Sequence, residues 1–207
     1  YSNTWLLRIA GAAKAGDQLE RAFYNALPGA VNRSFLGHVY FQSANMAPGT
    51  YSAAGRDASA GQKFDELYWH TPPCCTGNQV RALPNYVHHM IWGWNAPASD
   101  TDGSVPGLAI TMYGPVQSIA RVGIARIPVQ LSVHTEYPFG NGTLTIVLQR
   151  KAQAAPRSND HHFVDVRGDV PAFPLLLRVP RWTTLSQMHV SLDGVGAPLI
   201  LQQGLPG

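Results

Sequence analysis

Charged side chains are scarce in this chain of 207 residues. They make up 13% of the residues, against roughly 25% in an average soluble domain. Compositional drift explains such a deficit, and so does a surface covered by a partner or by further chain. The 15 basic and 12 acidic residues give a net charge of +3, and the basic residues are scattered without a run. Because a phosphate-binding surface needs clustered Lys and Arg, we expect no nucleic-acid partner.

Long hydrophobic runs are also absent. A membrane-spanning helix needs about 20 apolar residues in succession, and no segment of this chain approaches that. The first residues, YSNTWLLRIAG, lack the basic start and the small-residue cleavage site of a secretory signal. We therefore expect no membrane partner, and the localisation stays unassigned. Because the chain begins at Tyr1 without Met, we expect it to be an internal fragment of a longer protein.

Cysteine is nearly absent too. The two that occur, Cys74 and Cys75, are adjacent in the segment CCTGN. Such a pair can form a strained vicinal disulfide, pack as buried thiols or bind a metal as thiolates, and the spacing leaves all three open. Helical spacing begins near Asn78, and a helix N-terminus lowers the pKa of a thiol. Two thiolates do not complete a tetrahedral zinc site, so two further ligands would be needed.

Other residues around the cysteines are weaker candidates for this chemistry. His70 lies four residues before Cys74, but a histidine in an aromatic-rich loop is more often hydrogen-bonded than metal-bound. Glu66 is the nearest carboxylate in sequence and is more readily explained as a solvated loop residue than as a general acid. We expect His88 and His89 at the solvent edge of a helix, and the pair at 161–162 in a polar loop. No convincing pair of carboxyl groups, the usual glycosidase signature, is present.

Apolar periodicity predicts three helices in the first part of the chain. The first covers residues 5–13 and ends in the glycine-containing stretch 11–16. The second follows a capping-box pattern at residues 17–20 and stops at Pro28-Gly29. The third starts near Asn78, and Pro84 either kinks it or marks its first turn. Its apolar residues at helical spacing are Val80, Leu83, Val87, Met90 and Ile91.

Beyond residue 97 the apolar period changes from 3.6 to 2 residues. Short β-rich runs separated by turns such as Gly140-Asn141-Gly142 predict a β-sandwich, and residues 151–170 read as a long polar loop. We therefore predict a helical domain over residues 1–96, which carries the Cys-Cys motif, and a sandwich domain over 97–207. The runs are GLAITMY, IPVQLSVHTEY, TLTIVLQ, FPLLLRVP and MHVSLDG, and HVYFQ is an earlier extended piece.

The segment CCTGN followed by RALPNYVHHMIW resembles glycoside hydrolase family 127, the β-L-arabinofuranosidase family, and its uncharacterised relatives. LERAFYNALPGA is similar to the family's helix with the pattern ERxxYN, and HVYFQSAN to its extended segment. TEYPFGNGTLTI resembles the TxYPxxG turn, and FPLLLRVPRW the LRIPxW strand. MHVSLDG stands where the family places a strand ending in Asn-Gly, so the resemblance runs in order over most of residues 1–194.

The resemblance implies an α+β multidomain fold, in which the C-terminal helices of an (α/α)6 barrel precede an antiparallel β-sandwich, both incomplete. It also implies a retaining glycoside hydrolase acting on a carbohydrate substrate with a zinc cofactor. Carried over to this chain, Cys74 is the nucleophile and a zinc ligand, and Cys75 is a second zinc ligand. Tyr40 matches a sugar-contacting tyrosine, and an ordinary packing role for it is as well supported.

The chain departs from the family pattern in its missing third cysteine. The family's Glu-x-Cys ligands and its general acid/base Glu align upstream of Tyr1, so we expect the fragment alone to be inactive. The partner that completes it would be the remainder of its own chain or a homodimer partner. Two alternatives stay open: a non-catalytic carbohydrate-binding or structural β-sandwich protein, and a redox or zinc-binding thiol protein.

Overall fold

The computed structural model describes residues 1–31, 33, 37–39, 50–51, 63–66, 74–97, 103–153, 163–165 and 168–190. Helices and mostly antiparallel sheets occupy separate segments of the chain, so the predicted α+β class is confirmed. The chain forms two compact units, one of Tyr1–Gln18 with His89–Gly207 and the other of Leu19–His88. The domain assignment made from sequence stays a prediction. No described helix is long and apolar enough to cross a membrane.

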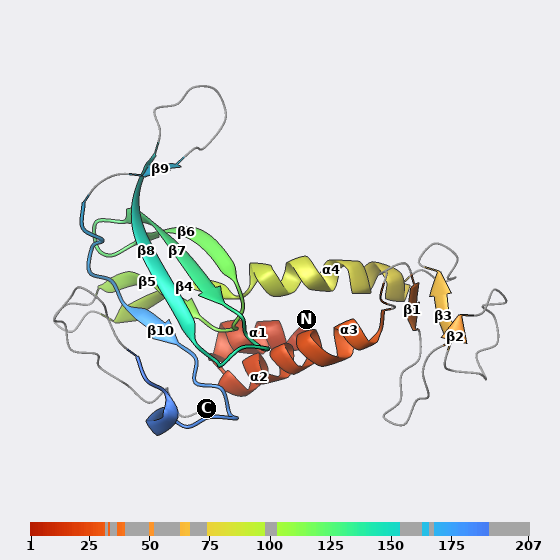
Figure 1. Cartoon of the computed structure of the whole chain (residues 1–207). Helices are drawn as coiled ribbons and strands as arrows, with labels where there is room; N and C mark the ends of the chain where they lie inside the picture. Colours follow the sequence, from red (N-terminus) through yellow and green to blue (C-terminus); the bar gives the residue numbers. More distant parts are fainter. Residues whose placement is uncertain are drawn as a thin grey trace. The chain divides into compact units, whose positions relative to one another are not determined.

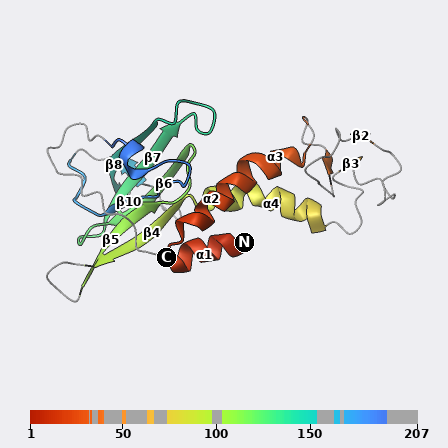
Figure 2. The same ribbon diagram turned by 90° about the horizontal axis from the view of Figure 1, so that it is seen from below.

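Two helices open the chain, and Figure 2 shows them as separate ribbons. α1 (Ser2–Ala10) ends at Gly11, whose φ of 61° places it in the left-handed region that favours glycine. α2 (Ala13–Arg21) begins four residues before the predicted capping box. The capping-box prediction is therefore wrong, because Asp17 lies inside α2 and cannot cap its first turn.

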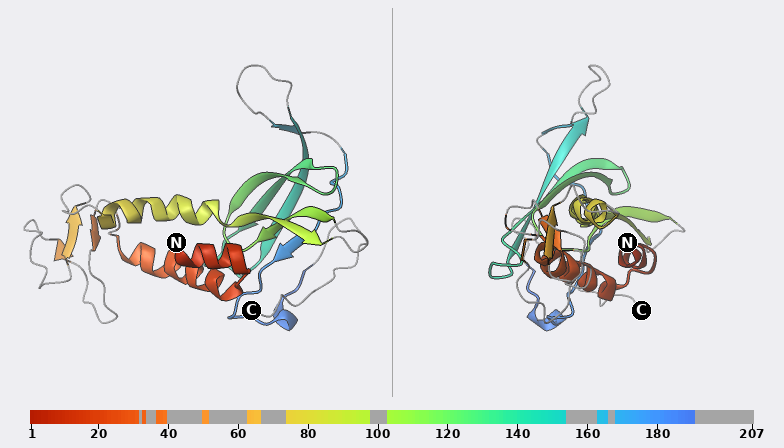
Figure 3. Two further views of the ribbon diagram at one scale, coloured as in Figure 1. Left: turned by 180° about the vertical axis from the view of Figure 1, so that it is seen from behind. Right: turned by 90° about the vertical axis from the view of Figure 1, so that its right-hand side faces the viewer.

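The boundary between the two units falls within α2, after Gln18, and helical structure continues beyond Arg21. A π-helical turn, η1 (Ala22–Ala26), and the short α3 (Leu27–Gly29) follow it, so the predicted stop at Pro28-Gly29 is confirmed. α4 (Cys74–His88) starts four residues before the predicted Asn78 and runs through Pro84 as one ribbon, drawn yellow in Figure 3. A small sheet in the order β1-β3-β2 also belongs to this unit; its strands are β1 (Gly37–Val39), β2 (Thr50–Tyr51) and β3 (Lys63–Glu66).

The buried face of α4 differs from the one that its periodicity predicts. Tyr86 is buried and stacks on Phe23 of η1, with the ring centroids 3.7 Å apart. Gln79, which lies about two turns earlier on α4, donates a hydrogen bond of 2.9 Å to the carbonyl oxygen of Leu27. The members of the predicted apolar stripe that lie on α4 are exposed; they are Val80, Leu83 and Val87. An aromatic stack and a hydrogen bond from a side-chain amide thus join α4 to the segment of η1 and α3, while the aliphatic stripe is exposed.

The first sheet of the other unit has the order β10-β5-β4. β4 (Ile91–Pro97) pairs antiparallel with β5 (Ser104–Ile110), and β10 (Leu175–Leu177) pairs parallel with β5. The helical period predicted through Ile91 is wrong at its end, because α4 stops at His88 and the chain enters β4 after a two-residue break. Met90, in this break, is 2% exposed, and its carbonyl oxygen accepts a hydrogen bond of 2.9 Å from the Thr111 backbone N–H.

The second sheet has the order β6-β7-β8-β9, and its first three strands lie side by side in Figure 1. Its strands are β6 (Val116–Val122), β7 (Ile127–Thr135), β8 (Leu144–Gln153) and β9 (Phe163–Asp165). Every pair in it is antiparallel, and Leu131 of β7 lies opposite both Ser118 and Leu148. A short 3-10 turn, η3 (Leu185–Gln187), comes later. The predicted strand MHVSLDG is not formed over residues 188–190, and the rest of it lies outside the described residues.

Both sheets contribute side chains to one hydrophobic core. Leu108 and Ile110 come from β5, while Val129 and Leu131 come from β7, and all four are 2% exposed or less. Tyr113, in the turn between β5 and β6, is also part of this core. Burial alternates with period 2 along β6, as expected of a strand with one face on a core.

Candidate functional site

Cys74 and Cys75 are the first two residues of α4, a helix of 15 residues. The first four N–H groups of a helix have no intrahelical acceptor, and the aligned peptide dipoles make this end partly positive. The first turn of α4 contains no acidic residue. An anion at this end of a helix is stabilised by these N–H groups and by this dipole.

The donor chemistry of the pair fits zinc only in part. Thiolates are preferred zinc ligands, and a structural or catalytic zinc takes three or four protein ligands. The 207 residues contain no cysteine besides these two. Within the described ranges, no group of three or more His, Cys, Asp or Glu side chains could hold a metal ion. A zinc ion bound by this pair would need further ligands from outside the described residues.

The other residues singled out from sequence are placed as follows. Tyr40, His70 and the histidines at 161–162 lie outside the described residues. Glu66 is the last residue of β3. His88 ends α4 and is exposed, whereas His89 is half-buried with its ring 4.8 Å from that of Trp92. One exposed and one half-buried histidine fit the expected solvent edge, but the helical position holds for His88 alone, because His89 follows the end of α4.

A buried carboxylate and two tyrosines lie in the unit that contains α4. Glu20 of α2 is 3% exposed, and the ring of Tyr24 meets that of Tyr86 edge-on at 5.8 Å. Burial raises the pKa of the Tyr24 phenol, its hydrogen bond with Tyr86 lowers that pKa, and the charge of Glu20 raises it again. The net shift is upward, so the phenol stays protonated at neutral pH and remains a hydrogen-bond donor. The sequence marked Glu20 only as the last residue of the capping-box pattern.

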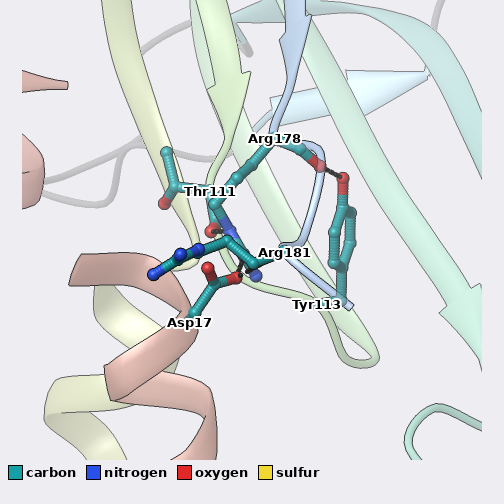
Figure 4. Close-up of polar contacts among 5 residues, drawn as sticks. All are labelled: Asp17, Thr111, Tyr113, Arg178 and Arg181. Carbon is teal, nitrogen blue, oxygen red and sulfur yellow. Dashed lines mark hydrogen bonds and ion pairs between the residues drawn. The ribbon is translucent and has the colours of Figure 1, made fainter. Parts of the chain in front are cut away.

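A buried ion pair dominates the polar contacts of the other unit (Figure 4). Nη1 of Arg178 contacts Oδ1 of Asp17, and Nε of Arg178 donates to the carbonyl oxygen of Thr111. The Tyr113 hydroxyl donates to the carbonyl oxygen of Arg178, and the Arg181 backbone N–H donates to Asp17 Oδ1 at 3.3 Å. The two charged side chains are 4% and 11% exposed. One arginine thus joins α2, the turn after β5 and the segment after β10.

Arg178 provides the counter-charge of the Asp17 carboxylate. Its second oxygen, Oδ2, is buried and has no hydrogen-bond partner among the described residues. The sequence did not predict this pair, because Asp17 fitted a capping box and Arg178 lay within a strand-like motif. Only the fold brings the two together, across 161 positions in sequence.

Comparison of the chain with protein-family models, with curated proteins and with solved structures gives no match. The resemblance to glycoside hydrolase family 127 therefore rests on the motifs quoted from the sequence.

Proposed function

We propose that this chain is part of a retaining glycoside hydrolase similar to the β-L-arabinofuranosidases of family 127, with Cys74 as the nucleophile. The observation that carries the proposal is the pair Cys74-Cys75 at the N-terminal turn of α4. Adjacent thiols at a helix start suit ionised sulfur, and the surrounding motifs resemble the family in the same order along the chain.

We further propose that the helices are the last ones of an (α/α)6 barrel and that β4 to β10 form a β-sandwich. Two mostly antiparallel sheets that fill one core support the sandwich assignment. The period-2 burial of β6 supports it as well. One feature departs from a purely antiparallel sandwich, because β10 pairs parallel with β5.

In the proposed reaction, the Cys74 thiolate attacks the anomeric carbon of a terminal sugar. A bond forms between Sγ and that carbon while the bond to the leaving oxygen breaks, and a carboxylic acid protonates this oxygen. The resemblance places that acid outside the 207 residues. Water then attacks the same carbon, the thiolate departs with its electron pair, and the carboxylate takes the proton. Two displacements on one carbon retain its configuration and replace one difficult step by two easier ones.

Zinc would be held by Cys74 and Cys75 with ligands from outside the described residues, and when bound it would keep the nucleophilic sulfur ionised at neutral pH. The start of α4 would act in the same direction through its dipole. Tyr40 would contact the sugar. The resemblance implies a furanoside. Residues other than Cys74 and Cys75 determine which sugar is bound.

A screen against nitrophenyl furanosides and pyranosides, with the full protein that carries this chain, tests the proposal. We expect turnover of β-L-arabinofuranosides, loss of that turnover on prolonged treatment with a chelator, and recovery on addition of zinc. We also expect about one zinc per chain in the wild type and less in the Cys75→Ser variant, because a structural thiolate ligand is lost. Protein that binds zinc but turns over no sugar would instead support a zinc-binding thiol protein.

A further inference from the structure

The end of α3 offers a backbone carbonyl group to a donor from another helix. In a continued α-helix the N–H of residue 31 would donate to the carbonyl of residue 27, but the Val31 N–H donates to the Pro28 oxygen at 3.3 Å. The Leu27 oxygen instead accepts from the Ala30 N–H at 3.2 Å and from Gln79 Nε2 at 2.9 Å. The shorter of its two hydrogen bonds therefore comes from α4.

A second contact holds the same face of α4. Tyr86 is 5% exposed and stacks on Phe23 of η1, with the ring planes at 8°. It follows Gln79 by seven residues, which is about two helical turns, so the two residues lie only about 20° apart around the helix axis. We call the side of α4 that carries Gln79 and Tyr86 its anchored face. Two contacts on one face, two turns apart, fix the rotation of a helix about its own axis.

Residue 75 belongs to the anchored face. It lies four positions before Gln79 and eleven positions before Tyr86 on the continuous helix α4. At 100° per residue, it is within about 40° of both around the helix axis. Residues separated by four positions are also neighbours along a helix surface. The rotation that these two contacts fix therefore turns residue 75 toward the segment of η1 and α3.

Residue 74 lies on a different side of α4. It is about 120° or more from both Gln79 and Tyr86 around the axis. Its own neighbours on the helix surface are Asn78 and Arg81, four and seven positions later, and both are exposed. Nε of Arg81 donates to Asn78 Oδ1 at 2.9 Å. The two adjacent cysteines thus occupy different sides of one helix, and residue 74 shares an exposed flank.

We propose that Gln79 is a positioning residue for the cysteine pair. Its hydrogen bond to the Leu27 carbonyl oxygen fixes the rotation that turns residue 75 toward η1 and α3 and residue 74 toward the exposed flank. Its role in catalysis rests on the proposed function, in which Cys74 must reach the sugar and Cys75 only the metal. A reacting group misplaced by about 1 Å costs about a hundredfold in rate, so this rotation matters for the chemistry.

Alkylation of the two thiols by iodoacetamide, in the full protein that carries this chain after removal of zinc, tests the proposal. Tandem mass spectrometry of the labelled peptide reports Cys74 and Cys75 separately. At a pH above the ordinary thiol pKa both sulfurs are ionised, so that access determines the two rates. We expect Cys74 to be labelled faster than Cys75, after each rate is divided by its value in the urea-unfolded protein.

Gln79→Met keeps the length of the side chain and removes the donor. We expect it to lower the ratio of the Cys74 rate to the Cys75 rate about fivefold, which corresponds to a net hydrogen bond of about 1 kcal/mol. Gln79→Lys restores a donor and should restore much of the ratio. Val80→Ala is the matched control on α4, because Val80 is 60% exposed, and it should leave the ratio unchanged.

Equal normalised rates of the two cysteines in the wild type would overturn the proposal, and so would a Gln79→Met variant with the wild-type ratio. Arg178→Met destabilises the other unit and should keep the ratio, which separates lost positioning from lost stability. The readout requires neither zinc nor hydrolysis. A protein without glycosidase activity therefore still tests the rotation, and hydrolysis with an unchanged ratio in Gln79→Met contradicts this proposal alone.

Discussion

Replacing Cys74 by Ala is expected to lower kcat for an activated arabinofuranoside about a thousandfold or more, because the variant lacks the group that forms the covalent bond to the sugar. Binding contacts with the sugar remain, so KM should change much less. Steady-state kinetics of the full protein measure both parameters. Zinc content measured on the same samples separates loss of the nucleophile from loss of the metal.

Val80→Ala is the matched control for this substitution. Val80 lies on the same helix and is 60% exposed, so its truncation tests whether any change on α4 affects the rate. We expect a change within about twofold, as for surface substitutions generally. Hydrolysis at the wild-type rate by the Cys74→Ala variant would show that the sulfur forms no covalent intermediate.

Replacing Arg178 by Met is expected to reduce the free energy of unfolding by about 3–5 kcal/mol, because the Asp17 carboxylate is left buried without its counter-charge. This is a large part of the 5–15 kcal/mol typical of a domain. Urea unfolding followed by circular dichroism measures the loss. Arg181→Ala is the matched control, because the contact of Arg181 with Asp17 comes from its backbone N–H, which the substitution keeps.

Two further variants test whether the loss comes from the buried pair. Asp17→Leu combined with Arg178→Met removes both charges and should recover much of the stability. Gly16→Ala should cost about 1–3 kcal/mol by overpacking, since a Cβ there would lie 2.8 Å from Cδ and Nε of Arg178. Gly77→Ala on α4 meets no atom within 4 Å and should not destabilise. An Arg178→Met variant as stable as the wild type would contradict the assigned role of the pair.

The elements that sequence predicted well are those with strong local signals. Pro28-Gly29 ended a helix as expected, and the runs around β7 and β8 carry long apolar alternation. β6 was missed because its inward positions hold small or polar residues such as Ser118 and Ala120, while the large Ile119 points outward and is 40% exposed. β4 was missed because Met90 and Ile91 continue the helical spacing of α4 by coincidence.

The residues of the candidate sites also differ in whether the sequence alone could identify them. Cys74 and Cys75 could be found from sequence because they are neighbours in the chain and need no fold to bring them together. The Asp17–Arg178 pair and the hydrogen bond from Gln79 to Leu27 join residues that lie far apart in sequence. No local pattern encodes such contacts, since each depends on how distant elements of the fold meet. Arg178 comes from the LRVPRW motif, which sequence alone marked only as a strand.

The most direct test of the nucleophile is to stop the full protein during turnover of an activated β-L-arabinofuranoside and to identify the modified peptide by mass spectrometry. The account predicts one pentosyl group on the sulfur of Cys74, and none in the Cys74→Ala variant. A sugar bound covalently to a carboxylate, or rapid hydrolysis with retention and an unmodified Cys74, would contradict it.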